Sequence, residues 1–305
     1  MEQLPVVFTF PGYETIGDTL IQSLKAVEGE MEQRTFPDGE VYRRIVTLVE
    51  GRDVILVGGT TDDSATLGLY DVATAAVHYG AHRLTLVVPY FGYSTMERAV
   101  LSGEVVTAKT RARLLSIIPP ASNGNRIFLL DLHSEGITHY FHSGMPARHL
   151  RATSVLLPVI RQVGGEEFVL GSTDAGRAKW VEGMANELGV EAAFIFKRRL
   201  SGSKTQVAAL NAPVEGRTVV IYDDMIRTGG SLIGAAQAYR DAGATRLIAV
   251  CTHGVFAAGA YQRIMGSGLF DKVISTDSHP AAIGLKDAGL QVVPVAGVFL
   301  SPLSI

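Results

Sequence analysis

The chain has 305 residues, 47% of them hydrophobic, and a formal net charge of −3 at pH 7 from 27 basic and 30 acidic side chains. This length exceeds the usual size of one α/β core, so we expect two domains of about 150 residues. The small net charge, without a long run of one sign, argues against a nucleic-acid-binding surface, and the single cysteine, Cys251, excludes a disulfide framework and a cysteine-based zinc site.

Residues 1–10, MEQLPVVFTF, lack the basic region, the long apolar core and the small-residue cleavage site of a secretory signal. No apolar stretch of the sequence approaches the roughly 20 residues that a membrane-spanning helix requires. We therefore expect a soluble, cytoplasmic protein that has no membrane partner.

Short β-branched runs alternate with longer, alanine-rich, helix-favouring runs. In the first half, a turn at residues 36–40 precedes a strand at 40–49, and strands at 53–59 and 83–92 flank a helix at 67–80. The alternation continues with strands at 167–174, 192–196, 218–224 and 244–256, and with helices at 175–189 and 232–243. This pattern predicts an α/β fold built from βαβ units, with mainly parallel sheets covered by helices on both faces.

A weak internal repeat links the two halves. Residues 53–92 and 218–256 each read as a strand, a loop, a helix, a glycine stop and a second strand, and Gly-Ala-X-Arg-Leu stands at the entrance to the second strand in both copies. Any two βαβ units share part of this pattern. The length of the chain nevertheless suits two duplicated halves.

Two adjacent carboxylates and a glycine turn specialise the second copy. Asp223 and Asp224 end the apolar strand, at the edge of an open α/β sheet where ligands bind. The turn that follows offers backbone N–H groups, hydroxyls and a helix N-terminus to a phosphate; its residues are Thr228, Gly229, Gly230 and Ser231. We expect a sugar phosphate whose hydroxyls meet the carboxylates, although an acidic strand end with an ordinary Gly-Gly loop remains an alternative.

This strand, acidic pair and turn resemble the phosphoribosyl-diphosphate motif of type I phosphoribosyltransferases and ribose-phosphate pyrophosphokinases. Further stretches resemble the pyrophosphokinases specifically and in the order of that family: residues 36–40, 89–93, 105–109, 131–141, 172–180, 196–199 and 252–256. The resemblance covers nearly the whole chain. It implies two similar type I phosphoribosyltransferase-like domains, at residues 1–148 and 149–305, the first on the nucleotide side and the second carrying the ribose 5-phosphate loop.

The resemblance also implies a reaction. The anomeric hydroxyl of ribose 5-phosphate attacks the β-phosphorus of Mg-ATP, and phosphoribosyl diphosphate (PRPP) and AMP are formed. By the same resemblance, His133 and Asp174 coordinate Mg²⁺ or its water molecules. Both follow strand-like segments, so we expect them at the same sheet edge as Asp223, with Asp174 as the better ligand for a hard cation.

The resemblance also implies residues that contact the transferred group and residues that bind the nucleotide. Lys197 and Arg199, in a basic loop after the strand at 192–196, match family positions that close over the transferred group. The nucleotide-side candidates are Phe36, Asp38, Glu40 and Arg98. In relatives the segment at 36–40 reaches the adenine of a neighbouring subunit, which implies a homo-oligomer, a dimer or hexamer, with a shared active site.

Three departures from the family pattern leave other functions open. Thr95 and Met96 stand where the family has Arg and Gln, Arg227 replaces a small or acidic residue of the phosphate loop, and Arg177 replaces a second glycine. Losing a phosphate-binding Arg removes a contact of roughly 1.5–3 kcal/mol. The alternatives are therefore a catalytically inactive regulatory subunit, or a related enzyme that uses a different pentose phosphate or pyrophosphoryl donor.

Overall fold

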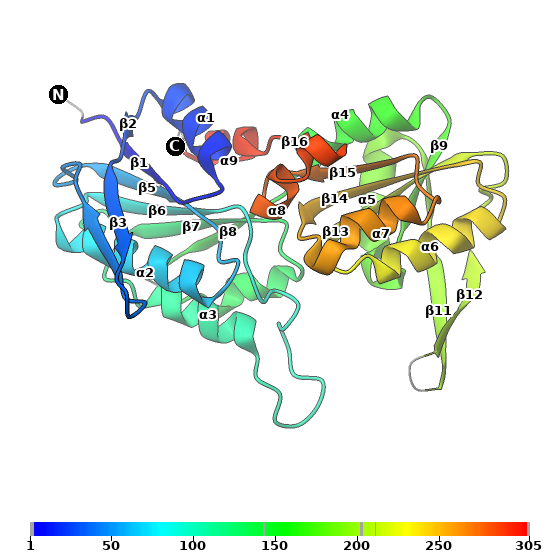
Figure 1. Cartoon of the computed structure of the whole chain (residues 1–305), viewed down its shortest axis with the longest axis horizontal. Helices are drawn as coiled ribbons and strands as arrows, with labels where there is room; N and C mark the ends of the chain where they lie inside the picture. The colour runs from blue at the N-terminus through cyan, green and yellow to red at the C-terminus, as the bar shows by residue number, and fades with distance from the viewer. Residues whose placement is uncertain (1–2, 143, 202–203, 211, 304–305) are drawn as a thin grey trace. The chain divides into compact units, whose positions relative to one another are not determined.

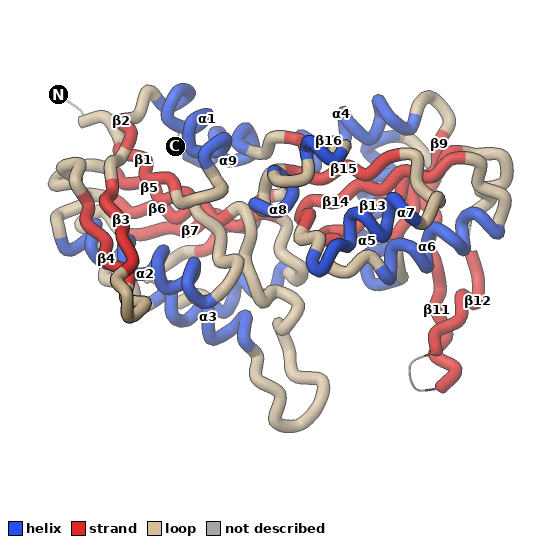
Figure 2. Tube along the Cα trace, in the orientation of Figure 1, coloured by secondary structure: helices blue, strands red, loops and turns tan. Residues whose placement is uncertain are grey.

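The computed structural model describes residues 3–142, 144–201, 204–210 and 212–303. The chain forms two compact units: unit 1 comprises Met1–Arg151 and Pro294–Ile305, and unit 2 comprises Ala152–Val293. Each unit is a parallel β-sheet flanked by helices (Figures 1 and 2), so the predicted α/β class with two similar domains is confirmed. In the described part of the chain, no helix has the length and the apolar character needed to cross a membrane.

The sheet of unit 1 has the strand order β2-β1-β5-β6-β7-β8, and all neighbouring strands run parallel. Its strands are β1 (Val6–Thr9), β2 (Val27–Glu28), β5 (Asp53–Val57), β6 (Arg83–Val88), β7 (Asn125–Leu130) and β8 (Ala147–Leu150). Helices α2 (Asp63–His78) and α3 (Thr107–Ser116) cover one face, and α1 (Glu14–Leu24) and α9 (Ala296–Leu303) cover the other, as Figure 1 shows. A separate antiparallel hairpin joins β3 (Met31–Thr35) to β4 (Val41–Ile45).

The sheet of unit 2 has the equivalent parallel order β10-β9-β13-β14-β15-β16. Its strands are β9 (Phe168–Ser172), β10 (Glu191–Ala193), β13 (Thr218–Ile226), β14 (Arg246–Gly254), β15 (Lys272–Thr276) and β16 (Gln291–Val293). Its helices are α4 (Thr153–Gly164), α5 (Ala178–Leu188), α6 (Gly230–Asp241), α7 (Ala260–Gly266) and α8 (Pro280–Ile283). Strand β9 is buried along its whole length, as expected for a parallel strand with helices on both faces.

The internal repeat is present in the backbone geometry. Gly80 and Gly243 both follow the helix of their copy with positive φ, at 87° and 91°. Each accepts a hydrogen bond through its carbonyl, from the N–H of Gly51 at 2.8 Å and of Gly216 at 2.9 Å respectively. Only a residue without a β-carbon adopts this conformation at low cost, so the matching glycines mark the same helix stop in both halves.

The two units are not divided as the sequence suggested. The second domain was expected to run to residue 305, but residues 294–305 group with unit 1. Helix α9 packs against α1, and a guanidinium N–H of Arg126 on β7 donates to the Pro302 carbonyl at 3.5 Å. A short terminal helix contains no signal that names its packing partner, so only the tertiary contacts decide its unit.

Candidate active site

Strand β13 carries the acidic pair into the edge of the unit 2 sheet. Asp223 is aligned with Cys251 on β14, and the preceding residue, Tyr222, is aligned with Ser172 at the end of β9. The strand does not stop at Asp224, as the sequence suggested, but continues to Ile226, because β14 extends to Gly254 and pairs with this last segment. The carboxylates therefore lie just past the end of β9 while still held in the sheet.

A cation faces both carboxylates. The Nη2 of Arg177 lies 2.9 Å from Oδ2 of Asp224, and its Nε lies 4.0 Å from Oδ1 of Asp223. Asp223 also accepts the hydroxyl of Thr173 at 2.8 Å and the backbone N–H of Asp224 at 2.9 Å. Burial, and next the charge of Asp224, raise the pKa of Asp223 well above its ordinary value, while Thr173 and Arg177 oppose this change.

The glycine turn follows β13, and α6 begins at Gly230, two residues earlier than expected, so the two glycines have different roles. Gly229 precedes α6 with φ at 79°, and a β-carbon there would lie 2.8 Å from Cγ1 of Ile264 on α7. A β-carbon on Gly230 would meet no atom within 4 Å, so the space over the first residue of α6 is open. The predicted residues Arg227, Thr228, Gly230 and Ser231 are exposed. The turn thus presents free space and a helix N-terminus to an anion.

A second basic residue, on α7, holds the backbone of this turn through hydrogen bonds. Arg263 on α7 donates from Nη2 to the carbonyl of Thr228 at 3.0 Å, and from Nη1 to the carbonyl of Ala258. The sequence analysis missed this residue. Its only sequence signal is a basic side chain in a helix, which does not reveal the loop it reaches.

Asp174 follows β9 and so lies at the same sheet edge as Asp223. Its Oδ1 accepts the N–H of Gly176 at 2.8 Å, and its carbonyl accepts the hydroxyl of Ser172 at 2.8 Å. The described residues contain no group of three or more His, Cys, Asp or Glu side chains that would hold a metal by themselves. Mg²⁺ commonly uses one or two carboxylates and completes its coordination with water and substrate phosphates, so Asp174 fits such a site.

His133 does not share that sheet edge, and this expectation was wrong. It follows β7, which belongs to the sheet of unit 1, whereas Asp174 and Asp223 belong to unit 2. Its segment is fixed by His149, whose Nε2 accepts the N–H of Leu132 at 3.0 Å. Burial lowers the pKa of His149, although the carboxylate of Glu135, 3.8 Å from the ring, acts in the opposite direction. The lowered pKa favours the neutral imidazole, whose Nε2 can accept this hydrogen bond.

The basic run at 197–199 lies in a strand rather than in a loop. Strand β11 (Ile195–Ser201) pairs with β12 (Lys204–Leu210) in an antiparallel hairpin separate from the main sheet, which Figure 1 shows projecting from unit 2. The sequence analysis expected a loop because the glycine-containing stretch after Arg199 hid the second strand. The side chains of Lys197 and Arg199 lie outside the described residues.

The nucleotide-side candidates lie in unit 1 on two segments. Phe36, Asp38 and Glu40 form the turn of the β3–β4 hairpin: the N–H of Phe36 donates to the Glu40 carbonyl at 2.8 Å, and Asp38 Oδ1 accepts the N–H of Glu40 at 3.1 Å. Phe36 is 39% exposed and lies under the guanidinium of Arg34, 5.2 Å from the ring centroid. Arg98 is also exposed and lies 3.4 Å from Glu97.

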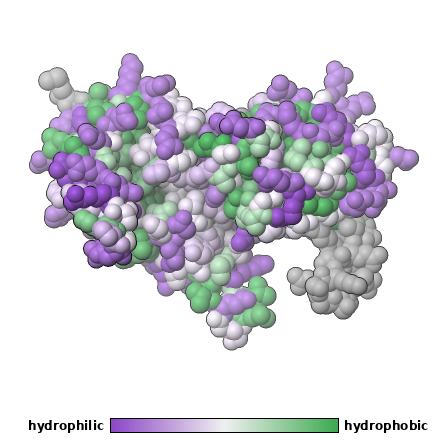
Figure 3. Space-filling model, in the orientation of Figure 1, coloured by the Kyte–Doolittle hydropathy of each residue, from purple (hydrophilic) through white to green (hydrophobic). Residues whose placement is uncertain are grey.

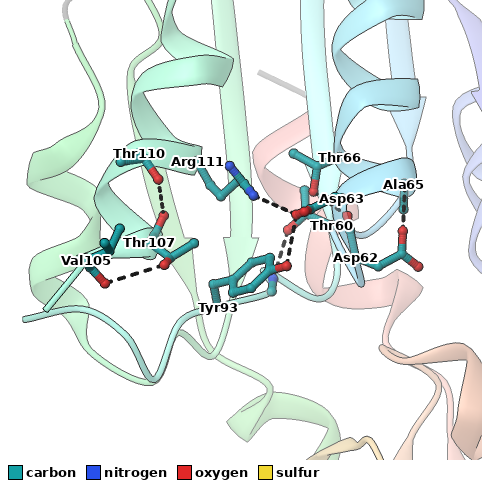
Figure 4. A network of polar contacts seen from close by, with 11 residues as sticks. Thr60, Asp62, Asp63, Ala65, Thr66, Tyr93, Val105, Thr107, Thr110 and Arg111 are labelled. Atoms are coloured by element: carbon teal, nitrogen blue, oxygen red, sulfur yellow. Dashed lines mark hydrogen bonds and ion pairs between the residues drawn. The ribbon is translucent and has the colours of Figure 1, made fainter.

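A polar network at the start of α2 fixes the segment before Arg98 (Figure 4). Oδ1 of Asp63 accepts the hydroxyl of Tyr93 at 2.9 Å and the Nη2 of Arg111 at 2.6 Å. Tyr93 has a positive φ of 59°, which costs free energy for a residue with a β-carbon, and the guanidinium of Arg111 lies over its ring at 5.2 Å. The network therefore holds a strained turn in one position.

Comparison with known proteins identifies the family. The family model described as the N-terminal domain of ribose phosphate pyrophosphokinase matches residues 6–118, and the phosphoribosyl synthetase-associated domain matches residues 182–299. A ribose-phosphate pyrophosphokinase of Ralstonia nicotianae is 32% identical over 98% of this chain and 92% of its own length. The chain belongs to the ribose-phosphate pyrophosphokinase family.

Other members of the ribose-phosphate pyrophosphokinase family also match this chain over most of its length. The relative of that name from Methanopyrus kandleri is 34% identical over 87% of this chain and 89% of its own length. The crystal structure of phosphoribosylpyrophosphate synthetase from Mycobacterium smegmatis superposes with a TM-score of 0.86, 26% identity, and coverage of 99% of this chain and 98% of that chain. This pyrophosphokinase chain therefore matches its relatives over both units rather than over a shared fragment.

The sequence analysis did not foresee the contact between Asp63 and Arg111 in this pyrophosphokinase chain. Asp63 and Arg111 are separated by 48 residues and carry no motif of their own. Arg177 was noted as a departure from the family pattern, but its contact with both carboxylates was not foreseen. Salt bridges across such distances in sequence depend on the packing of helices against strands, which no local pattern encodes.

Proposed function

We propose that this protein transfers the pyrophosphoryl group of Mg-ATP to the anomeric hydroxyl of ribose 5-phosphate, with PRPP and AMP as products. In this step the hydroxyl oxygen bonds to the β-phosphorus, the bond from that phosphorus to the bridging α–β oxygen breaks, and the hydroxyl proton is released. We assign the reaction to the cytoplasm, where ATP is available. The observation that carries the proposal is the acidic pair on β13, in which Asp224 is buried and Asp223 is partly exposed. The pair leads directly into the open turn before α6.

The turn before α6 binds the 5-phosphate in this proposal. Backbone N–H groups and the hydroxyls of Thr228 and Ser231 donate to the phosphate oxygens, and Arg227 adds positive charge. The open space over Gly230 lets the phosphate approach the backbone closely. Asp223 and Asp224 belong to the part of the site that meets the sugar hydroxyls. Contacts with these hydroxyls orient the anomeric hydroxyl towards ATP.

Charge neutralisation comes from several groups. Asp174 is the candidate ligand of Mg²⁺ in unit 2, and the ion would supply positive charge against the phosphate oxygens as the bond to AMP breaks. A role of His133, in unit 1, in metal binding stays a prediction of the family resemblance. Lys197 and Arg199 act on the same charge and exclude water. Such preorganised cations do little covalent chemistry but lower the energy of the transition state.

The nucleotide side uses unit 1. Phe36 offers a ring face for adenine, while Asp38, Glu40 and Arg98 offer polar contacts. The exposed apolar residues of the segment after Tyr93, namely Val100, Leu101 and Val105, are 77%, 68% and 65% exposed, and Figure 3 shows hydrophobic surface on this projecting segment. Such exposure supports a homo-oligomer, a dimer or hexamer, in which a neighbouring subunit shares the active site.

The purified chain would be incubated with ribose 5-phosphate, ATP and Mg²⁺ while AMP and PRPP are followed. Equal amounts of both products are expected, with strong loss in Asp223→Asn and normal rates in Arg217→Gln, which removes a surface ion pair with Glu191. Binding of ribose 5-phosphate without turnover would point to an inactive subunit. Turnover only with another pentose phosphate or nucleotide would assign a different substrate.

A further inference from the structure

Arg177 stands between the end of β9 and the start of α5, on a 3-10 turn at Ala175–Arg177. Its side chain is 11% exposed. The guanidinium lies 2.9 Å from Asp224, 4.0 Å from Asp223 and 5.8 Å from the ring centroid of Trp180. One buried cation thus faces the two carboxylates that the sugar site requires.

The two carboxylates differ in what remains available for a ligand. The side chain of Asp224 is 2% exposed and accepts a short charge-assisted contact from Arg177. The side chain of Asp223 is 18% exposed, lies farther from the guanidinium and is held by the hydroxyl of Thr173. A sugar hydroxyl can therefore approach Asp223, whereas Asp224 is already covered by its ion pair.

Charge gives the contact a further effect. A pair of ionised carboxylates would repel a sugar phosphate, which is itself an anion. The guanidinium adds one positive charge that offsets this repulsion. Removing the guanidinium from a buried carboxylate is unfavourable, so without the charge of Arg177 the Asp224 side chain would take up a proton, move, or disturb Asp223.

We propose that Arg177 is a positioning residue of the sugar site, which holds Asp224 in an ion pair and leaves Asp223 as the carboxylate presented to the hydroxyls of ribose 5-phosphate. This role rests on the proposed function. It assigns different tasks to the two acidic residues, whereas the sequence suggested that both face the sugar. It also gives a role to the arginine that stands where the family resemblance leads us to expect a second glycine.

The test measures ribose 5-phosphate binding by calorimetry and steady-state kinetics in Arg177→Gln, Arg177→Lys and the double variant Arg177→Gln/Asp224→Asn. Arg177→Gln is expected to raise both Kd and KM for ribose 5-phosphate about tenfold or more, with kcat within about threefold of wild type. Arg177→Lys keeps the positive charge, so its Kd for ribose 5-phosphate is expected to lie within about threefold of the wild-type value. The double variant also removes the buried negative charge at position 224 and is expected to bind better than Arg177→Gln.

The matched control is Arg217→Gln, which removes an arginine–carboxylate pair next to the opposite end of β13 and is expected to leave Kd unchanged. Circular dichroism confirms that each variant is folded. An unchanged Kd in Arg177→Gln overturns the role of Arg177, and so does a double variant that binds more weakly than Arg177→Gln. A wild-type chain that binds no ribose 5-phosphate would refute the proposed function itself, which keeps the two failures distinct.

Discussion

Replacing Gly229 with alanine tests the construction of the phosphate turn. The φ of 79° places an alanine in the left-handed region, which costs about 1 to 2 kcal/mol. The new methyl group would lie 2.8 and 2.9 Å from two carbon atoms of Ile264, a fully buried side chain, and such overpacking costs about 1 to 3 kcal/mol more. Gly229→Ala should therefore destabilise unit 2 by about 2 to 5 kcal/mol.

The single tryptophan, Trp180, lies in α5, so its fluorescence reports the unfolding of unit 2 in urea. In an Ile264→Ala background the steric part of the penalty should vanish and the backbone part should remain. Gly230→Ala is the matched control, because its φ is not positive and its β-carbon meets no atom within 4 Å. It should leave stability nearly unchanged yet weaken ribose 5-phosphate binding, because its methyl group occupies the space for the phosphate. Equal stability of the two variants would refute this reasoning.

Three further predictions concern catalysis, the nucleotide side and pH. Lys197→Ala should lower kcat at least about a hundredfold while leaving the Kd for ribose 5-phosphate nearly unchanged; an unchanged kcat would contradict its role. Tyr93→Phe removes the hydroxyl contact with Asp63 and should raise KM for ATP about threefold without affecting KM for ribose 5-phosphate, as measured by steady-state kinetics. Burial, and next the charge of His253, lower the pKa of His279 to about 4, so the native state favours the neutral ring more than the unfolded chain does. Its contribution to stability is present above the unfolded pKa of about 6.5 and is lost as pH falls towards 4, by up to about 3 kcal/mol. His279→Asn keeps an acceptor for the N–H of Ala281 and should flatten this loss in urea unfolding at pH 4 to 7; identical pH profiles would exclude the effect.

The sequence by itself determined the class of fold, and it predicts the sugar half of the site. Alternating apolar runs, glycine stops and the run from Asp223 to Ser231 depend on neighbours a few residues apart, and a strand followed by a turn and a helix folds locally from such a pattern. The same locality explains why the duplicated glycines Gly80 and Gly243 were recognisable, because each must take a positive φ where its helix ends.

Tertiary structure alone decided which distant groups meet. It paired Arg177 with Asp224, joined Asp63 to Tyr93 and Arg111, assigned α9 to unit 1 and separated His133 from the sheet of Asp223. None of these outcomes has a periodic signal, because each depends on how whole helices and strands pack and on which buried charge finds a partner at close range. Sequence motifs identify the candidate functional groups, but the packing of the elements sets the charge around each group and how far each is exposed to a substrate.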